Sequence, residues 1–222
     1  MRLLTALTVL VLMMVSSATA GVVTYTSSTA FFAALAGATP QVEDYSSPVF
    51  SDGQDISLGS TLDGITYSDF VLTGGATQLD ITNKFNSFSG LSLGADHTTN
   101  AGLTFFFGGE GATITFAAPV FAVGIFDNVN LNSGNYSVTA AGTTASTDST
   151  AYDTSTFVFA GLISTTPFTS ASFTSSDSAL GSFNVAEIVS VATPEPSAWF
   201  GLGLIALALA WRRIRTTAAN RN

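Results

Sequence analysis

Cysteine is absent from the 222-residue sequence, and this absence removes several kinds of structure and chemistry at once. Disulfide bonds, cysteine-ligated zinc sites and cysteine nucleophiles are all excluded. Histidine occurs only once, as His97, which leaves too few ligands for a typical zinc site. The fold therefore depends on its hydrophobic core, or on a metal held by oxygen ligands.

Charge is also scarce, because charged residues make up 9% of the chain. Residues 21–193 contain one lysine, Lys84, against fourteen carboxylates, which makes their formal net charge −13. A surface of this sign repels phosphate backbones, so nucleic acid is excluded as a partner. The charge attracts divalent cations, but we interpret it mainly as a device for solubility.

The first twenty residues have the three parts of a secretory signal peptide. Arg2 supplies the positive start, residues 3–15 form a short apolar run, and Ala18 and Ala20 form a small-x-small cleavage site. The run is short for a membrane-spanning helix, which disfavours the alternative of an uncleaved anchor. We predict that residues 1–20 are removed and that the mature chain begins at Gly21.

A second apolar run, residues 198–211, lies close to the C-terminus. As a helix it is about 21 Å long, less than the roughly 30 Å of a bilayer core, so a packed core helix is the alternative. Trp199 and Trp211 bracket the run, which has no polar face. Three arginines follow it, namely Arg212, Arg213 and Arg215. Because such a cluster resists translocation and can snorkel, we predict a single transmembrane helix with residues 217–222 as a cytoplasmic tail.

Two prolines stand just before this run, in the motif formed by Pro194, Glu195 and Pro196. Proline lacks an amide hydrogen and disfavours helix in the residue before it, so we expect the motif to be extended and accessible. The order of motif, short apolar helix and arginine cluster in residues 193–216 resembles the PEP-CTERM sorting domain of Gram-negative bacteria. The tail after the arginines is longer than is usual in that family.

The resemblance implies a partner and a route. The partner is an exosortase, a membrane-embedded transpeptidase that resembles a cysteine protease and recognises the motif. Anchoring in the inner membrane by the C-terminal helix would come first, and cleavage would then release the protein or transfer it to the cell surface. Proteins of this family often occur in strains that make extracellular polysaccharide.

Residues 21–192 form the predicted exported domain, of a size that supports one core. Short apolar runs separated by Gly, Asn and Asp turns predict an all-β fold, an antiparallel β-sandwich with jelly-roll-like topology. One short N-terminal helix is expected over residues 29–36, capped by Ser27 or Ser28. Its buried side chains are predicted to be Phe31, Phe32 and Leu35.

The predicted strands are 22–26, 41–45, 64–70, 78–82, 91–94, 102–107, 112–116, 119–126, 136–140, 157–161, 170–174 and 182–191. Residues 48–60 are predicted to be a loop. The phenylalanine-rich segment 102–107 is expected to be central. The segment 119–126 lacks polar alternation, which predicts a strand buried on both faces. The two faces are expected to carry Phe121, Val123 and Ile125 on one side and Val120, Ala122 and Phe126 on the other.

No residue pattern predicts catalysis. His97 lies in a polar segment with no serine nucleophile motif nearby, and we interpret it as a solvated loop histidine. Residues 127–134 place oxygen side chains at alternate positions, as calcium loops do, but they lack the glycine and glutamate of an EF-hand. The same residues fit a hairpin turn. No cofactor is therefore predicted, with calcium as the alternative.

We predict a non-catalytic protein of the cell surface or extracellular matrix. The alternative is a carbohydrate-binding module for extracellular polysaccharide, which would present tyrosines because residues 21–193 contain no tryptophan. A secreted hydrolase with two acting carboxylates is a third hypothesis. The candidate tyrosines are Tyr25, Tyr45, Tyr67, Tyr136 and Tyr152.

Overall fold

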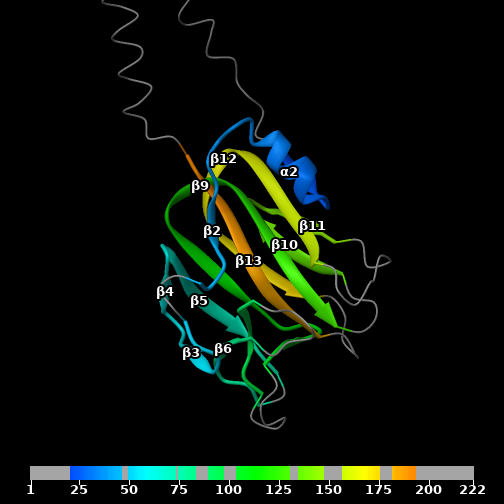
Figure 1. Ribbon diagram of the computed structural model, residues 1–222. Coiled ribbons are helices and arrows are strands. Elements are labelled where there is room, and N and C mark those ends of the chain that lie inside the picture. Colours follow the sequence, from blue (N-terminus) through cyan, green and yellow to red (C-terminus); the bar gives the residue numbers. More distant parts are fainter. Residues whose placement is uncertain are drawn as a thin grey trace, which may run out of the picture. The chain divides into compact units, whose positions relative to one another are not determined.

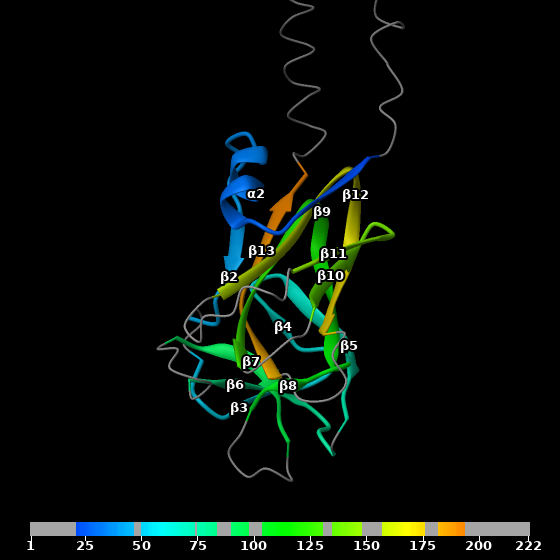
Figure 2. The same cartoon turned by 90° about the vertical axis from the view of Figure 1, so that its right-hand side faces the viewer.

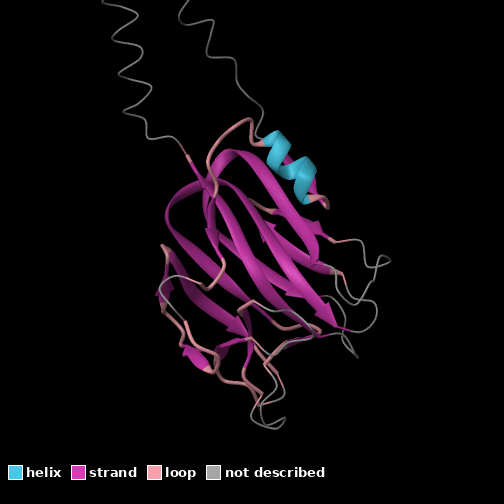
Figure 3. Cartoon of the chain, in the orientation of Figure 1, coloured by secondary structure: helices cyan, strands magenta, loops and turns pink. Residues whose placement is uncertain are grey.

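The computed structural model describes residues 21–46, 50–73, 75–83, 90–97, 104–130, 135–147, 157–175 and 182–193. The chain divides into two compact units, Met1–Ala192 and Thr193–Asn222, and nearly all the described residues lie in the first. The described part of this unit is antiparallel β structure with one short helix (Figure 1; Figure 3). The prediction of a mainly antiparallel β domain with an N-terminal helix is confirmed.

The described residues form thirteen strands and one helix. In chain order these are β1 (Val22–Tyr25), α2 (Ser28–Ala34), β2 (Gln41–Glu43), β3 (Gln54–Ile56), β4 (Thr61–Leu62), β5 (Ile65–Val71), β6 (Leu79–Thr82), β7 (Ser92–Ala95), β8 (Phe106–Phe107), β9 (Gly111–Asn130), β10 (Tyr136–Ala140), β11 (Thr143–Ser146), β12 (Phe157–Ser175) and β13 (Ser182–Ala192). Strands β3, β4 and β11 lie where the sequence predicted none. These strands are so short that the alternation of apolar and polar residues cannot be detected in them.

The two longest strands, β9 and β12, run side by side, and their pairing shifts register between Ile163 and Ser170. Before the shift, β12 pairs on its outer edge with β1; after it, the partner is β10. Strand β9 likewise changes its outer partner from β5 to β13 along its length. Each of these continuous strands replaces two separate strands that the sequence predicted, because a register shift allows a strand to bend without ending.

Strands β9 and β12 therefore belong to two groups of strands. One group has the order β2-β13-β9-β12-β1, and the other has the order β5-β9-β12-β10-β11. The short strands β7 and β8 pair with β13, and β6 and β3 extend outward from β7. In the turned view of Figure 2, these four short strands gather at the lower end of the domain, away from α2.

The main core contains side chains from both groups, such as Ile114 and Phe173 from one and Ile125 and Ile188 from the other. A second, smaller cluster lies under α2. Strand β9 contributes to both clusters, so the predicted burial of residues 119–126 on both faces is confirmed. For two residues of this segment, however, the predicted face of the strand is wrong. Val120 packs in the main core and Phe121 against the smaller cluster, because the register shifts at Val120.

Helix α2 begins at the predicted cap, where the Ser27 hydroxyl accepts a hydrogen bond from the amide of Ala30 at 3.4 Å. Phe31 is buried against β12, whereas Phe32 is 38% exposed, so its predicted burial is wrong. Consecutive helix residues point about 100° apart, so Phe32 lies at the edge of the inner face, where its ring stacks against Phe126 at a centroid distance of 6.5 Å.

The segment expected to be a central strand is also different from its prediction. In its described part only β8 is a strand, and β8 pairs with β13 alone.

Candidate functional site

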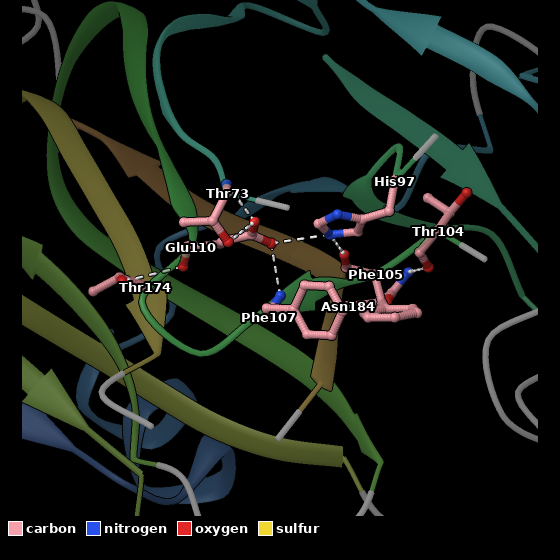
Figure 4. Close-up of polar contacts among 8 residues, drawn as sticks. All are labelled: Thr73, His97, Thr104, Phe105, Phe107, Glu110, Thr174 and Asn184. Carbon is pink, nitrogen blue, oxygen red and sulfur yellow. Dashed lines mark hydrogen bonds and ion pairs between the residues drawn. The ribbon is translucent and has the colours of Figure 1, made fainter. Parts of the chain in front are cut away.

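His97 lies in a buried polar cluster just after β7 (Figure 4). Its side chain is 1% exposed, and its Nε2 atom lies 3.0 Å from the carbonyl oxygen of Phe105 and 3.2 Å from Oε2 of Glu110. The rings of Phe105 and Phe107 pack against the imidazole at centroid distances of 5.4 Å and 4.5 Å. The expectation of a solvated loop histidine is therefore wrong, because residues from the following segment close over the ring.

Glu110 is the acceptor at the centre of this cluster (Figure 4). Its Oε1 atom accepts hydrogen bonds from the amide of Thr73 at 2.5 Å and from the hydroxyl of Thr73 at 2.7 Å. Its Oε2 atom accepts from the amide of Phe107 at 2.7 Å and faces His97. Its own carbonyl oxygen accepts from the hydroxyl of Thr174 at 3.1 Å. One buried residue thus joins β12 to the segments that follow β5, β7 and β8.

The geometry favours a structural role for this cluster over proton transfer. Both neighbours of His97 Nε2 accept hydrogen bonds, so this nitrogen carries a hydrogen. The Nδ1 atom is buried and has no partner among the described residues. An activated nucleophile needs a hydroxyl in contact with its base. The hydroxyl of Thr73 donates to the oxygen of Glu110 that does not face His97, and that of Thr174 donates to the carbonyl oxygen of Glu110.

A second polar group ties β13 to its short neighbours. Asn184 donates from Nδ2 to the hydroxyl of Ser92 at 3.2 Å and to the carbonyl oxygen of Thr104 at 3.1 Å. Thr104 in turn donates from its hydroxyl to Oδ2 of Asp80 at 3.0 Å. Burial raises the pKa of Asp80, and the hydrogen bond from Thr104 partly opposes that rise. These bonds hold β6, β7 and the segment before β8 around β13.

A third polar group, two carboxyl groups and two tyrosines, contributes to the main core. The hydroxyl of Tyr67 donates to that of Tyr45 at 3.4 Å, and the amide of Tyr45 donates to Oε1 of Glu43 at 2.8 Å. Burial raises the pKa of Glu43 to about 7 and raises the pKa of both phenols. A negative charge on Asp127 would raise the pKa of Tyr45 further, which places this carboxyl near the phenol.

Asp127 differs from the other buried acids because it has no compensating contact. It is fully buried in β9, and neither carboxyl oxygen has a hydrogen-bond partner among the described residues. Burial raises its pKa well above the ordinary value for aspartate. An unpartnered carboxyl in an apolar core is stable only when it is protonated. Burial therefore favours the neutral, protonated form of Asp127.

The calcium alternative rested on residues 127–134, which begin at Asp127. Residues 127–130 belong to β9, so the first half of the segment is a strand and not a loop. Residues 131–134 lie outside the described residues. Across the part of the chain that the structure describes, no three His, Asp or Glu side chains are grouped as metal ligands would be.

The tyrosines that the carbohydrate-binding alternative would use as a platform pack toward the interior. Tyr45, Tyr67 and Tyr136 are all buried. Tyr25 is half-buried and packs edge-on against Phe31 at a centroid distance of 5.8 Å. Tyr152 lies outside the described residues. The tyrosines described here therefore pack as core residues, as most tyrosines in β proteins do.

The residues predicted to direct export and sorting lie outside the described residues. They are the cleavage residues Ala18 and Ala20, the motif Pro194, Glu195 and Pro196, and the arginines Arg212, Arg213 and Arg215. Among the residues that are described, no helix has the length and hydropathy needed to cross a bilayer. The signal peptide, the motif and the transmembrane helix stay predictions.

Neither the comparison with protein-family models nor the comparison with curated proteins finds a match to this chain.

Sequence reasoning missed the pairing of His97 with Glu110. The available signal was the isolation of Glu110, which is the one charged residue between positions 98 and 126 and stands in a glycine-rich turn among apolar runs. A lone carboxylate in such a setting is a candidate for burial.

Proposed function

We propose that this chain is a non-catalytic protein that is exported to the cell surface or extracellular matrix and sorted by an exosortase. The observation that carries the proposal is the order of Pro-Glu-Pro motif, apolar run and arginine cluster at the C-terminal end. The end of the β domain supports it, because β13 ends at Ala192 and the second compact unit begins at Thr193. Protease-like enzymes act most readily on segments outside folded strands, so a motif at this place in the sequence suits the proposal.

We further propose that the domain is a β-sandwich of jelly-roll-like topology. Its support is the pair of bent strands, β9 and β12, which take part in two groups of strands that share one main core. Strands that pass between packed sheets by bends and bulges are known from sandwich architectures.

A scaffold role is supported by where the polar chemistry lies. The described histidine and its glutamate are buried and bonded within the fold, and the unpartnered Asp127 faces no solvent. Together with the formal charge of −13 over residues 21–193, this suits a soluble exported domain that displays its surface and performs no reaction.

The sorting proposal is tested by intact mass and cell fractionation. The full chain is produced in a Gram-negative host with an exosortase and in a matched host without it. We expect a species that begins at Gly21 and ends between Pro194 and Ser197, found only when the enzyme is present. A triple variant, Pro194→Ala, Glu195→Ala and Pro196→Ala, is expected to keep its full C-terminus in both hosts. The variant Thr217→Ala, which changes only the tail, is expected to be processed normally.

A full-length C-terminus in the inner membrane of both hosts would contradict the proposal. The C-terminal segment would then be an ordinary anchor, and the function of the domain would lie at that membrane.

The alternative function is carbohydrate binding by the same exported domain. The buried tyrosines do not support it, but a hollow elsewhere on the surface does. A glycan screen with and without calcium separates a binding module from a purely structural protein.

A further inference from the structure

A surface hollow lies where β12 leaves β1 and joins β10. Its volume is about 450 Å³, within the range of about 300–1,000 Å³ that is typical of small-molecule sites. The lining residues are Val22, Ala141, Thr143, Ser164, Thr166, Pro167 and Phe168. They come from β1, the β10–β11 turn, β11 and the bend of β12.

The walls of the hollow are held in place by bonds within the fold. At the bend, the hydroxyl of Ser164 donates to the carbonyl oxygen of Thr166 at 2.7 Å and accepts from the amide of Thr166 at 3.1 Å. The amide of Gly21 donates to the hydroxyl of Thr165 at 2.8 Å, which fixes the start of β1 beside the bend. The site is therefore formed before any ligand arrives, and little ordering is needed on binding.

The chemistry of the lining favours a neutral ligand. None of the seven lining residues is charged, so an ion bound there would have no side chain of opposite charge. The formal charge of −13 over residues 21–193 disfavours acidic ligands further. The lining instead includes two threonines, Thr143 and Thr166, and the apolar residues Pro167 and Phe168.

A ligand that matches both features has hydroxyl groups along its edge and an apolar C–H face. Neutral sugars have this combination, and aromatic side chains receive their C–H faces. Phe168 is the aromatic residue that lines the hollow. Its ring is fixed by edge-to-face packing against that of Phe116, at a centroid distance of 6.3 Å and an interplanar angle of 68°.

We propose that this hollow binds a neutral carbohydrate, one or two sugar units of a glycan. The inference gives a site to the carbohydrate-binding alternative and rests on that alternative, independently of sorting by an exosortase. In this proposal Phe168, and not a tyrosine, is the aromatic residue that contacts the sugar. No sequence pattern indicated a site on this surface.

The test measures binding of neutral tetrasaccharides of glucose, mannose, galactose and N-acetylglucosamine to the full chain. Acidic tetragalacturonate serves as the charged comparison. The chain is kept in a detergent without a sugar head group, and binding is followed by isothermal titration calorimetry. We expect at least one neutral tetrasaccharide to bind, tetragalacturonate not to bind, and chelation of calcium to leave the affinity unchanged.

Variants locate the binding. Thr166→Val and Thr143→Val each remove one hydroxyl and are expected to weaken binding by about 2- to 12-fold, the range of one hydrogen bond. Thr143→Trp fills the hollow on a strand that tolerates aromatic residues and is expected to abolish binding. The control is Thr139→Val with Thr144→Val, which removes a hydroxyl pair on the same hairpin outside the hollow. It is expected to bind like the parent chain.

Circular dichroism and thermal midpoints confirm that each variant is folded. The proposal is overturned if no neutral tetrasaccharide binds at millimolar concentrations. It is equally overturned if the folded Thr143→Trp variant binds like the parent, or if tetragalacturonate alone binds. Processing by an exosortase does not enter any of these measurements, so failure of the sorting proposal would be seen separately.

Discussion

The substitution Asp127→Asn tests whether a neutral acid is built into the core. Asp127 is fully buried in β9, and its carboxyl oxygens have no hydrogen-bond partner among the described residues. Asparagine has nearly the same shape but does not ionise. The substitution therefore leaves packing almost unchanged and removes one titration.

The magnitude follows from the pKa of Asp127, which burial raises well above its ordinary value. In the unfolded chain the group loses its proton near a pH of about 3.9, whereas the folded domain retains it to a higher pH. Folding therefore takes up a proton in the interval between the two values, and stability falls as the pH rises through it. The loss is about 1.4 kcal/mol per pH unit.

Other buried acids add to the slope of the parent protein. The pKa of Glu43 is raised to about 7, so it contributes a similar loss from near its ordinary pKa up to about pH 7. This contribution is present in both proteins and cancels in their difference. Asp127→Asn is thus expected to lose less stability than the parent as the pH rises above about 4, the ordinary pKa of aspartate.

Urea unfolding of the full chain at several pH values measures this difference. Far-UV circular dichroism is the suitable signal, because both tryptophans, Trp199 and Trp211, lie beyond the β domain. Asp44→Asn is the comparison that removes a carboxylate whose own titration lies below this range, and its pH dependence is expected to differ from that of the parent only through Glu43 and Glu187, whose pKa values the charge of Asp44 raises. Hydrogen bonds from Ser46 lower the pKa of Asp44, so it is ionised in both states over this range. Parallel pH dependence of the parent and Asp127→Asn would refute the reasoning.

Three further experiments test the packing and the polar cluster, each by the shift of the urea midpoint. Glu110→Gln turns one acceptor oxygen of the side chain into an amide donor that faces other donors, and it is expected to destabilise the domain by about 2–4 kcal/mol. A change under about 0.5 kcal/mol would contradict the structural role of the Glu110 hydrogen bonds. Gly124→Ala places a Cβ 2.6 Å from the ring of Phe159 and is expected to cost about 1–3 kcal/mol, whereas Gly53→Asn, at an open position, is expected to cost less, since only the strain of its positive φ opposes it. Phe31→Ala is expected to cost about 3–5 kcal/mol and its neighbour Phe32→Ala less than about 1 kcal/mol, so equal effects would refute the orientation of α2.

Local pattern was a sound guide to the regular elements. The serine cap and apolar spacing predicted α2, and the unbroken apolar run at residues 119–126 predicted a strand buried on both faces. Both signals arise from residues that are neighbours in the chain, so no knowledge of distant segments was needed.

The joining of elements was not predictable in the same way. Strand β9 continues past Pro119, although the sequence suggested a break there, because the neighbouring strands shift register and allow the bend. The Phe159 ring also packs beside the facing pair Gly124 and Gly161, which only their alignment across β9 and β12 creates.

The polar sites show more clearly what local sequence could not predict. A histidine in a polar stretch was interpreted as solvated, and this interpretation was wrong for His97. Its partner Glu110 is brought to it by the turn between β8 and β9, and Asp127 of β9 comes near Tyr45, which follows β2. Charge and polarity belong to one residue, but burial depends on what the rest of the fold places around it.

The sequence by itself determined the class of structure, since alternation, caps and glycine turns act over a few residues. It also carries the ordered features at the two ends on which the sorting proposal rests. Only the tertiary structure decided which polar groups are buried, which strands continue through a bend, and where the hollow between β1, β11 and β12 opens. The reason is physical: these properties depend on contacts between segments far apart in the chain, and such contacts exist only after the sheet has closed.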